Sequence, residues 1–181
     1  MKFTAQPLSG VYTIDLNLLS DERGSFARTF CKDEFFKIGH TKEFVQFNQS
    51  WNIKQGTIRG MHYQIPPFQE VKLIRCIRGA IYDVVIDIRK DSPTFLQHFA
   101  IELSEDNNTM LLIPEGFAHG FQTLKDNTQL LYHHTEYYKP NSEAGLRFDD
   151  TSLNINWKLP VSVISERDQN HPLITPNFKG I

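Results

Sequence analysis

The chain has 181 residues, the size of one domain, and 40% of them are hydrophobic, which excludes a disordered or fibrous protein. Nineteen basic against twenty-one acidic residues give a formal net charge of −2, which argues against a protein that holds nucleic acid or an anionic membrane by bulk charge. We therefore expect one domain over residues 1–181, with neither nucleic acid nor a membrane as its partner.

The first residues and the two cysteines indicate a cytoplasmic protein. Residues 1–24 lack the apolar core of a signal peptide, and no run of eighteen residues is free of Asp, Glu, Lys and Arg. Cys31 and Cys76 lie far apart and form no CxxC pattern, so the sequence favours neither a disulfide framework nor a cysteine-rich zinc site.

In chain order, the pattern is that of a mainly β protein with few short helices. The first thirty residues contain β-rich segments, and residues 31–39 predict one or two helical turns that end at Gly39. A second short helix is expected at residues 149–153 or 165–170, and the tail from Asn170 is expected to be irregular. Further strands are predicted at residues 44–51, 71–78, 80–89, 97–103, 110–113 and 129–135. Many short strands indicate a sandwich or a barrel.

The clearest strand is residues 80–89, where side chains alternate with a period of two. Val84 and Ile86 share one face, and Asp83 and Asp87 share the other, so one face is expected to form core. Gly79 precedes this strand and predicts a hairpin or a tight bend.

Polar side chains also alternate along two other stretches. If residues 60–64 are extended, His62 and Gln64 share one face with Tyr63 opposite, and the polar residues of 46–50 likewise share a face. A polar face inside a small barrel would line a ligand pocket, whereas outside it would simply meet solvent. For either strand taken alone, solvent exposure is favoured.

The third candidate stretch is residues 113–121. Pro114 and Gly116 predict a turn, and His119 then enters the next strand among apolar neighbours. A lone histidine of this kind is more often a structural hydrogen-bonding residue than a catalyst.

Together, these stretches resemble the two motifs of the cupin superfamily. Gly56, His62, Gln64, Glu70 and Gly79 follow the first motif, and the residues from Pro114 to His119 follow the second. Metal-binding cupins usually place a histidine where this chain has Gln64. The resemblance therefore implies a cupin-like double-stranded β-helix, or jelly roll, without a metal or other cofactor.

Within that superfamily, the sequence resembles the dTDP-4-dehydrorhamnose 3,5-epimerase family over nearly its whole length. The matching motifs are DERGSF from Asp21, QFNQS from Gln46, GTIRGMHYQ from Gly56, VKLIRC from Val71, DVVIDIRKDSPT from Asp83, LIPEGFAHGF from Leu112, LY from Leu131, YYKPNSE from Tyr137 and SERD from Ser165. The resemblance implies epimerisation at C3, C5 or both of a nucleotide-diphospho-4-keto-6-deoxyhexose. A proton α to the C4 ketone would leave, and a proton would return from the opposite face.

The resemblance also implies catalytic roles. His62 matches the base, Asp168 matches its carboxylate partner, and Tyr132 matches the proton donor. Lys72, with Arg59, would stabilise negative charge on the C4 oxygen. Without the family resemblance, the sequence alone would favour Tyr132 as a core residue whose hydroxyl group reaches solvent.

A further set of positions matches residues that hold the nucleotide sugar in the family. They are Arg23, Arg28, Gln46, Asn48, Arg59, Lys72, His119, Tyr138, Glu143 and Arg167. Arg28 stands where many members have Glu, so the base of the substrate stays open, and Arg167 replaces a commoner lysine. The family also implies a homodimer whose exchanged N-terminal strands complete the partner's site.

Two alternatives remain at this point. A metal-dependent cupin enzyme would need ligands beyond His62 and His119. A cupin that binds a nucleotide sugar without turnover would have no need for a proton donor opposite a proton acceptor.

Overall fold

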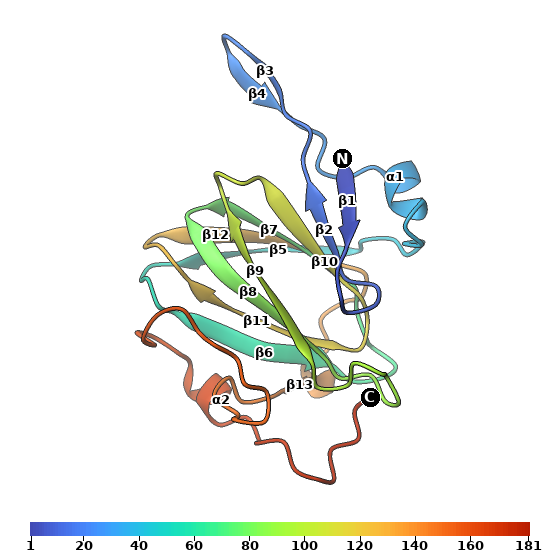
Figure 1. Cartoon of the computed structure of the whole chain (residues 1–181), viewed down its shortest axis with the longest axis vertical. Coiled ribbons are helices and arrows are strands. Elements are labelled where there is room, and N and C mark those ends of the chain that lie inside the picture. The colour runs from blue at the N-terminus through green and yellow to red at the C-terminus, as the bar shows by residue number, and fades with distance from the viewer.

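The computed structural model describes residues 1–181, and strands dominate it (Figure 1). The strands are β1 (Lys2–Ala5), β2 (Tyr12–Asp15), β3 (Leu19–Asp21), β4 (Gly24–Phe26), β5 (Gln46–Asn52), β6 (Ile58–Gln64), β7 (Lys72–Arg78), β8 (Ala80–Asp87), β9 (His98–Ser104), β10 (Thr109–Ile113), β11 (Phe117–Thr123), β12 (Thr128–His134) and β13 (Glu143–Gly145). The helices are α1 (Lys32–Phe36), the 3-10 turn η1 (Pro140–Ser142) and α2 (Glu166–Gln169). The predicted strands are confirmed to within two residues at each end, and no helix is long and apolar enough to cross a membrane.

Two antiparallel sheets form the body of the protein. One has six strands in the order β1-β2-β10-β7-β12-β5, and the other has five in the order β13-β6-β11-β8-β9. Their inner faces enclose an apolar core that includes Ile74, Val85, Leu111, Phe121 and Leu130. This arrangement confirms the predicted mainly β, cupin-like jelly roll.

The bend at Gly79 joins the two sheets. β7 ends at Arg78 in the six-stranded sheet, and β8 begins at Ala80 in the five-stranded sheet. Gly79 has a φ of +77°, and a Cβ there would collide with Thr128, so only glycine fits. The predicted tight bend at Gly79 is confirmed. The alternative prediction of a hairpin is wrong, because β7 and β8 do not pair with each other.

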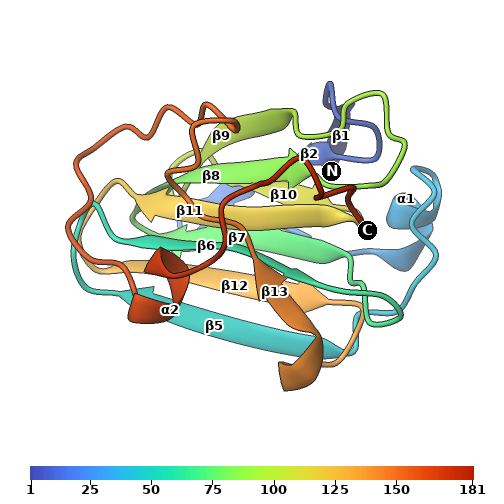
Figure 2. The same ribbon diagram turned by 90° about the horizontal axis from the view of Figure 1, so that it is seen from below.

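Both faces of β8 are buried, where the sequence predicted one. Ile81 and Val85 face the core between the sheets, and Val84 and Ile86 pack outward against Leu153 and neighbouring C-terminal residues. Figure 2 shows this C-terminal segment crossing the outer face of the five-stranded sheet. The alternation in the sequence reports two faces, but it cannot show that a distant segment covers the second one.

The helices agree with the sequence analysis in part. α1 lies within residues 31–39, and its Phe35 is buried against the outer face of the six-stranded sheet. α2 occupies the second of the two predicted helix positions, whereas residues 149–153 form turns. The residues after Asn170 form no helix or strand, as expected.

The hairpin of β3 and β4 projects from the body (Figure 1). Leu19 and Phe26 in this hairpin are 63% and 71% exposed. The hairpin therefore exposes two large apolar side chains to solvent.

Candidate active site

A polar pocket of about 310 Å³ opens between the two sheets. Its walls come from β5, β7 and β12 on one side and from β6 and β11 on the other. The residues of the predicted set that line it are Asn48, Arg59, His62, Lys72, His119, Tyr132, Tyr138, Glu143 and Arg167. On β7 and β12, the inward side chains change from apolar Ile74 and Leu130 in the core to polar Lys72 and His134 in the pocket.

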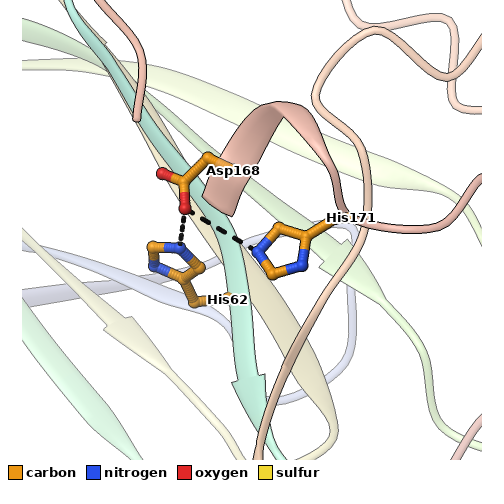
Figure 3. A group of neighbouring side chains, drawn as sticks. All are labelled: His62, Asp168 and His171. Carbon is orange, nitrogen blue, oxygen red and sulfur yellow. Dashed lines mark hydrogen bonds and ion pairs between the residues drawn. The ribbon is translucent and has the colours of Figure 1, made fainter. Parts of the chain in front are cut away.

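His62 and Asp168 form a hydrogen-bonded pair at the wall made by β6 (Figure 3). His62 Nε2 lies 2.8 Å from Asp168 Oδ1, and the backbone N–H of Gly60 donates to Asp168 Oδ2 at 3.0 Å. Burial alone would raise the pKa of Asp168, but the hydrogen bonds from His62 and Gly60 hold it well below its ordinary value. An ionised carboxylate only accepts, so Nε2 carries a proton and the lone pair of Nδ1 is free to act as a base.

α2 places Asp168 behind His62. The Oγ of Ser165 accepts a hydrogen bond from the backbone N–H of Asp168 and caps the helix. The Asp168 side chain is almost fully buried, with 3% of its surface exposed, whereas that of His62 is 24% exposed toward the pocket. The local sequence therefore fixes the carboxylate and leaves the imidazole accessible.

Lys72 lies in a second charged group on the six-stranded sheet. Its Nζ is 3.2 Å from Glu70 Oε1, and His134 Nδ1 is 2.8 Å from Glu70 Oε2. Burial favours the neutral acid, but Lys72 and His134 lower the pKa of Glu70 below its ordinary value. Glu70 is thus ionised, and it holds the ammonium group of Lys72 in a largely dry part of the pocket.

Tyr132 lies on β12 in the sheet that faces His62. Its hydroxyl group is 2.9 Å from Ser50 Oγ on β5. Burial raises the pKa of Tyr132 well above its ordinary value, which the hydrogen bond to Ser50 opposes only in part. The phenol is therefore protonated at neutral pH and can donate a proton.

His119 and Arg59 are also fixed by neighbours. His119 Nε2 lies 2.6 Å from Asp83 Oδ1, and both side chains are buried. Arg59 Nε donates to Asn52 Oδ1 at 2.6 Å. The expectation that His119 is a hydrogen-bonded histidine agrees with this pair, although the residue also lines the pocket.

The rim of the pocket carries the exposed members of the predicted set. The hydroxyl group of Tyr138 donates to Glu143 Oε2 at 2.8 Å, and Arg167 Nη1 pairs with the same oxygen at 2.7 Å. The backbone N–H of Tyr138 donates to Gln46 Oε1 at 3.0 Å. These four side chains come from three separate parts of the sequence and meet at one edge.

Arg23 and Arg28 lie outside the pocket of their own chain. Arg23 is paired with Asp21 in the projecting hairpin, and Arg28 is paired with Glu34 of α1. Every other residue of the predicted set lies in the pocket or directly beside it.

Among the polar side chains that contact the predicted residues, Ser50, Glu70, Asp83 and His134 lie outside the predicted set. Ser50, Glu70 and His134 each lie two residues from a predicted residue, and Asp83 is hydrogen-bonded to His119. His134 follows Tyr132 by two positions and therefore shares its face, so the period of two could have identified it. The polar face of β5 likewise meets the pocket, although solvent exposure was favoured for it.

The metal-dependent cupin alternative needs donors that this site does not offer. The amide of Gln64 is bound to backbone groups of Lys139 and Phe68, Glu70 is bound to Lys72 and His134, and His119 is bound to Asp83. Apart from His62, the donors that the cupin motifs would supply are thus committed to other partners, and this motif set does not fit a divalent ion.

Comparisons with known proteins agree with this geometry. The family model for dTDP-4-dehydrorhamnose 3,5-epimerase matches residues 5–175. The dTDP-4-dehydrorhamnose 3,5-epimerase of Sinorhizobium fredii is 40% identical over 173 residues, which are 95% of this chain and 89% of that protein. The crystal structure of the Bacillus anthracis enzyme with TDP and PPi bound has a TM-score of 0.93 and 40% identity, and covers 96% of this chain and 99% of that one. The Legionella pneumophila dTDP-6-deoxy-D-glucose-3,5-epimerase in complex with dTDP-4-keto-L-rhamnose has a TM-score of 0.90 and 35% identity, and covers 95% and 92%.

Proposed function

We propose how the side chains of this pocket work, from the premise that the chain belongs to the dTDP-4-dehydrorhamnose 3,5-epimerase family. Its reaction is that of the family: epimerisation at C3 and C5 of dTDP-4-dehydro-6-deoxyglucose, giving dTDP-4-dehydrorhamnose. The observation that carries the assignment is that a base with a buried carboxylate partner and a protonated phenol extend from opposite sheets into one pocket.

Proton abstraction falls to His62. The lone pair of Nδ1 takes the proton α to the C4 ketone, and the resulting imidazolium is stabilised by Asp168 at 2.8 Å. Because the carboxylate is buried and hydrogen-bonded to Gly60, it is already oriented for the charge that develops on the ring.

The negative charge of the enolate lies on the C4 oxygen, and Lys72 is the cation that meets it. Its side chain is only 10% exposed, so its charge is poorly screened. Glu70 and His134 keep the ammonium group in place before the substrate arrives.

Reprotonation falls to Tyr132, which donates its phenolic proton from the face opposite His62. Ser50 can donate to the phenolate that remains, because its hydroxyl group is already within hydrogen-bond distance. A base and an acid on opposite walls give inversion rather than return of the same proton.

The nucleotide end of the substrate binds at the rim of the pocket. There, Tyr138 offers an aromatic ring for the nucleotide, and Arg167 offers a cation for the diphosphate. We assign Arg59 to the same diphosphate. Arg23 and Arg28 reach this end only in a homodimer, in which the hairpin of one subunit completes the site of the other.

Exposed apolar side chains support the homodimer. Phe47 and Trp51 on the outer face of β5 are 67% and 59% exposed, and Leu19 and Phe26 of the hairpin are exposed to a similar degree. A second copy would cover both surfaces, and such a dimer has a direct test. Mixing inactive His62→Ala subunits with inactive Arg23→Glu subunits should restore about a quarter of the activity, since half of the dimers are mixed and each mixed dimer has one intact site. No recovery would contradict a shared site.

The two cysteines are free, which supports the proposal that the protein works in the reducing cytoplasm.

The function itself is tested with 4-keto-6-deoxyglucose on dTDP, UDP, CDP and GDP carriers, with the products identified by NMR. We expect conversion of the dTDP sugar to the doubly inverted product. Faster conversion on another carrier would overturn the dTDP assignment, and a product inverted at one carbon would overturn the double epimerisation. Binding without any conversion would favour the binding-protein alternative.

A further inference from the structure

His171 joins the catalytic pair to form a cluster of three potential metal ligands (Figure 3). One donor atom each from His62, Asp168 and His171 lies within 4.8 Å of the other two. Asp168 Oδ1 is 2.8 Å from His62 Nε2 and 3.7 Å from His171 Nε2. The carboxylate oxygen therefore lies between two imidazole nitrogens.

His171 has no other partner in the chain. Its Nε2 is buried and makes no hydrogen bond, because 3.7 Å to Asp168 is too long for one. A buried nitrogen without a partner is costly, and it calls for a physical explanation. The ring occupies this position because residue 145 is glycine, where any Cβ would collide with the imidazole.

We propose that His62, Asp168 and His171 form a binding site for Zn²⁺, or a divalent ion of similar preference, and that its occupation reversibly inhibits the enzyme. Two imidazoles and one carboxylate suit zinc, whereas Mg²⁺ and Ca²⁺ prefer oxygen ligands. Three protein ligands leave a fourth position for water. Binding requires the donor atoms to move by less than about 1 Å to reach the usual zinc distances of about 2.0–2.2 Å.

The guanidinium group of Arg167 opposes this site, since its Nη2 lies 3.3 Å from His62 Nε2 and its Nε lies 3.5 Å from Asp168 Oδ1. Arg167 is 55% exposed and also pairs with Glu143, so it can turn fully toward Glu143 when a cation binds. A bound cation would thus replace two contacts of Arg167, one with His62 and one with Asp168.

Inhibition follows from the nitrogen that the metal would use. The free base donates from Nε2 and keeps the lone pair of Nδ1 for the substrate. A metal on Nε2 is bound by the lone pair of Nε2, so the one proton of the neutral ring must lie on Nδ1. The Nδ1 lone pair is then no longer available, and the base is blocked. The metal site and the active base are therefore mutually exclusive states of one imidazole.

The first test measures metal binding without substrate, because a nucleotide diphosphate itself binds zinc. Chelator-treated protein is titrated with Co²⁺, whose visible absorption reports low-symmetry coordination by nitrogen and oxygen, and then with Zn²⁺ by calorimetry. Wild-type protein and the matched variants His171→Gln and His98→Gln are compared, since His98 on β9 lies outside the cluster. We expect one equivalent of metal in wild-type protein and His98→Gln, and binding weaker by about tenfold or more in His171→Gln.

The second test measures epimerase activity against free Zn²⁺. His171→Gln should keep the activity and lose the inhibition, while EDTA should restore the inhibited wild-type enzyme. Equal metal affinity in wild-type protein and His171→Gln would overturn the proposal, as would binding without inhibition. If His171→Gln fails to fold, His171→Asn provides the same comparison. The cobalt spectrum does not depend on turnover, so a failure of the metal site is distinguishable from a failure of the proposed reaction.

Discussion

Replacing Asp168 by Asn tests the catalytic pair with a minimal change of shape. The amide oxygen can still accept from the backbone N–H of Gly60, so the position of α2 is kept. The amide nitrogen then faces His62 Nε2 and donates to it. This forces the ring proton onto Nδ1, which removes the lone pair that we propose takes the substrate proton.

The size of the effect follows from the geometry. With about 4 Å between the centres of the imidazolium and carboxylate charges and an effective dielectric constant of about 20, their attraction is about 4 kcal/mol. Losing that stabilisation of the imidazolium slows proton abstraction by about 10³-fold, and the wrong tautomer adds to the loss. KM should change little, because Asp168 lies behind His62 rather than against the substrate.

The assay is the rate at which solvent deuterium enters C3 and C5, followed by NMR. Asp150→Asn is the matched control, since Asp150 is a buried carboxylate that accepts from Ser152 and the backbone of Ile174, away from the pocket. It should lower thermal stability and leave the exchange rate unchanged. An Asp168→Asn variant that exchanges within tenfold of wild type would refute the role of the pair.

Four other predictions follow from the same structure. Tyr132→Phe should keep part of the deuterium exchange and lose most net inversion, because the base remains and the acid is gone; equal losses of both, measured by NMR, would contradict this. Lys72→Met should lower kcat by about 10²- to 10³-fold in a steady-state assay, because a preorganised charge at the C4 oxygen is lost; a change confined to KM would argue for a binding role alone. Burial alone would raise the pKa of Asp87, but hydrogen bonds from Arg89, Ser92 and Thr94 lower it to about 2; its contribution to stability is therefore full above about pH 4 and is lost as the pH falls toward 2. Asp87→Asn should thus lose about 2 kcal/mol in urea unfolding at pH 7, with a difference that shrinks toward pH 2, and a constant difference would exclude this linkage. Chelator treatment should leave the epimerase activity unchanged, and activity that is lost on chelation and restored by metal would favour the metal-dependent alternative.

The strands were predictable because their signal is local. The period of two and the turn residues determine each strand separately, and Gly79 is identifiable as a bend from its type alone. The sequence could not show that the strands before and after that bend join different sheets, because packing between distant segments decides which sheet each strand joins. The second buried face of β8 depends likewise on residues beyond Leu146.

The site was predictable mainly through the family resemblance. Nothing near Asp168 in the sequence shows that it meets His62, which lies 106 positions earlier. The pairs of Tyr132 with Ser50 and of His119 with Asp83 also join different strands, so only the register of the sheets brings them together. A residue such as His171, which no motif singled out, becomes visible only when its partners are in place.

The central claim is that one pocket removes and returns protons at two carbons with His62 as the base. Its most direct test is incubation of the chelator-treated protein with dTDP-4-dehydro-6-deoxyglucose in D₂O, beside His62→Ala, with NMR at both carbons. The account predicts deuterium at C3 and C5 of the wild-type product and at neither carbon with His62→Ala. Deuterium uptake by His62→Ala at the wild-type rate, or inversion without any solvent label, would contradict it.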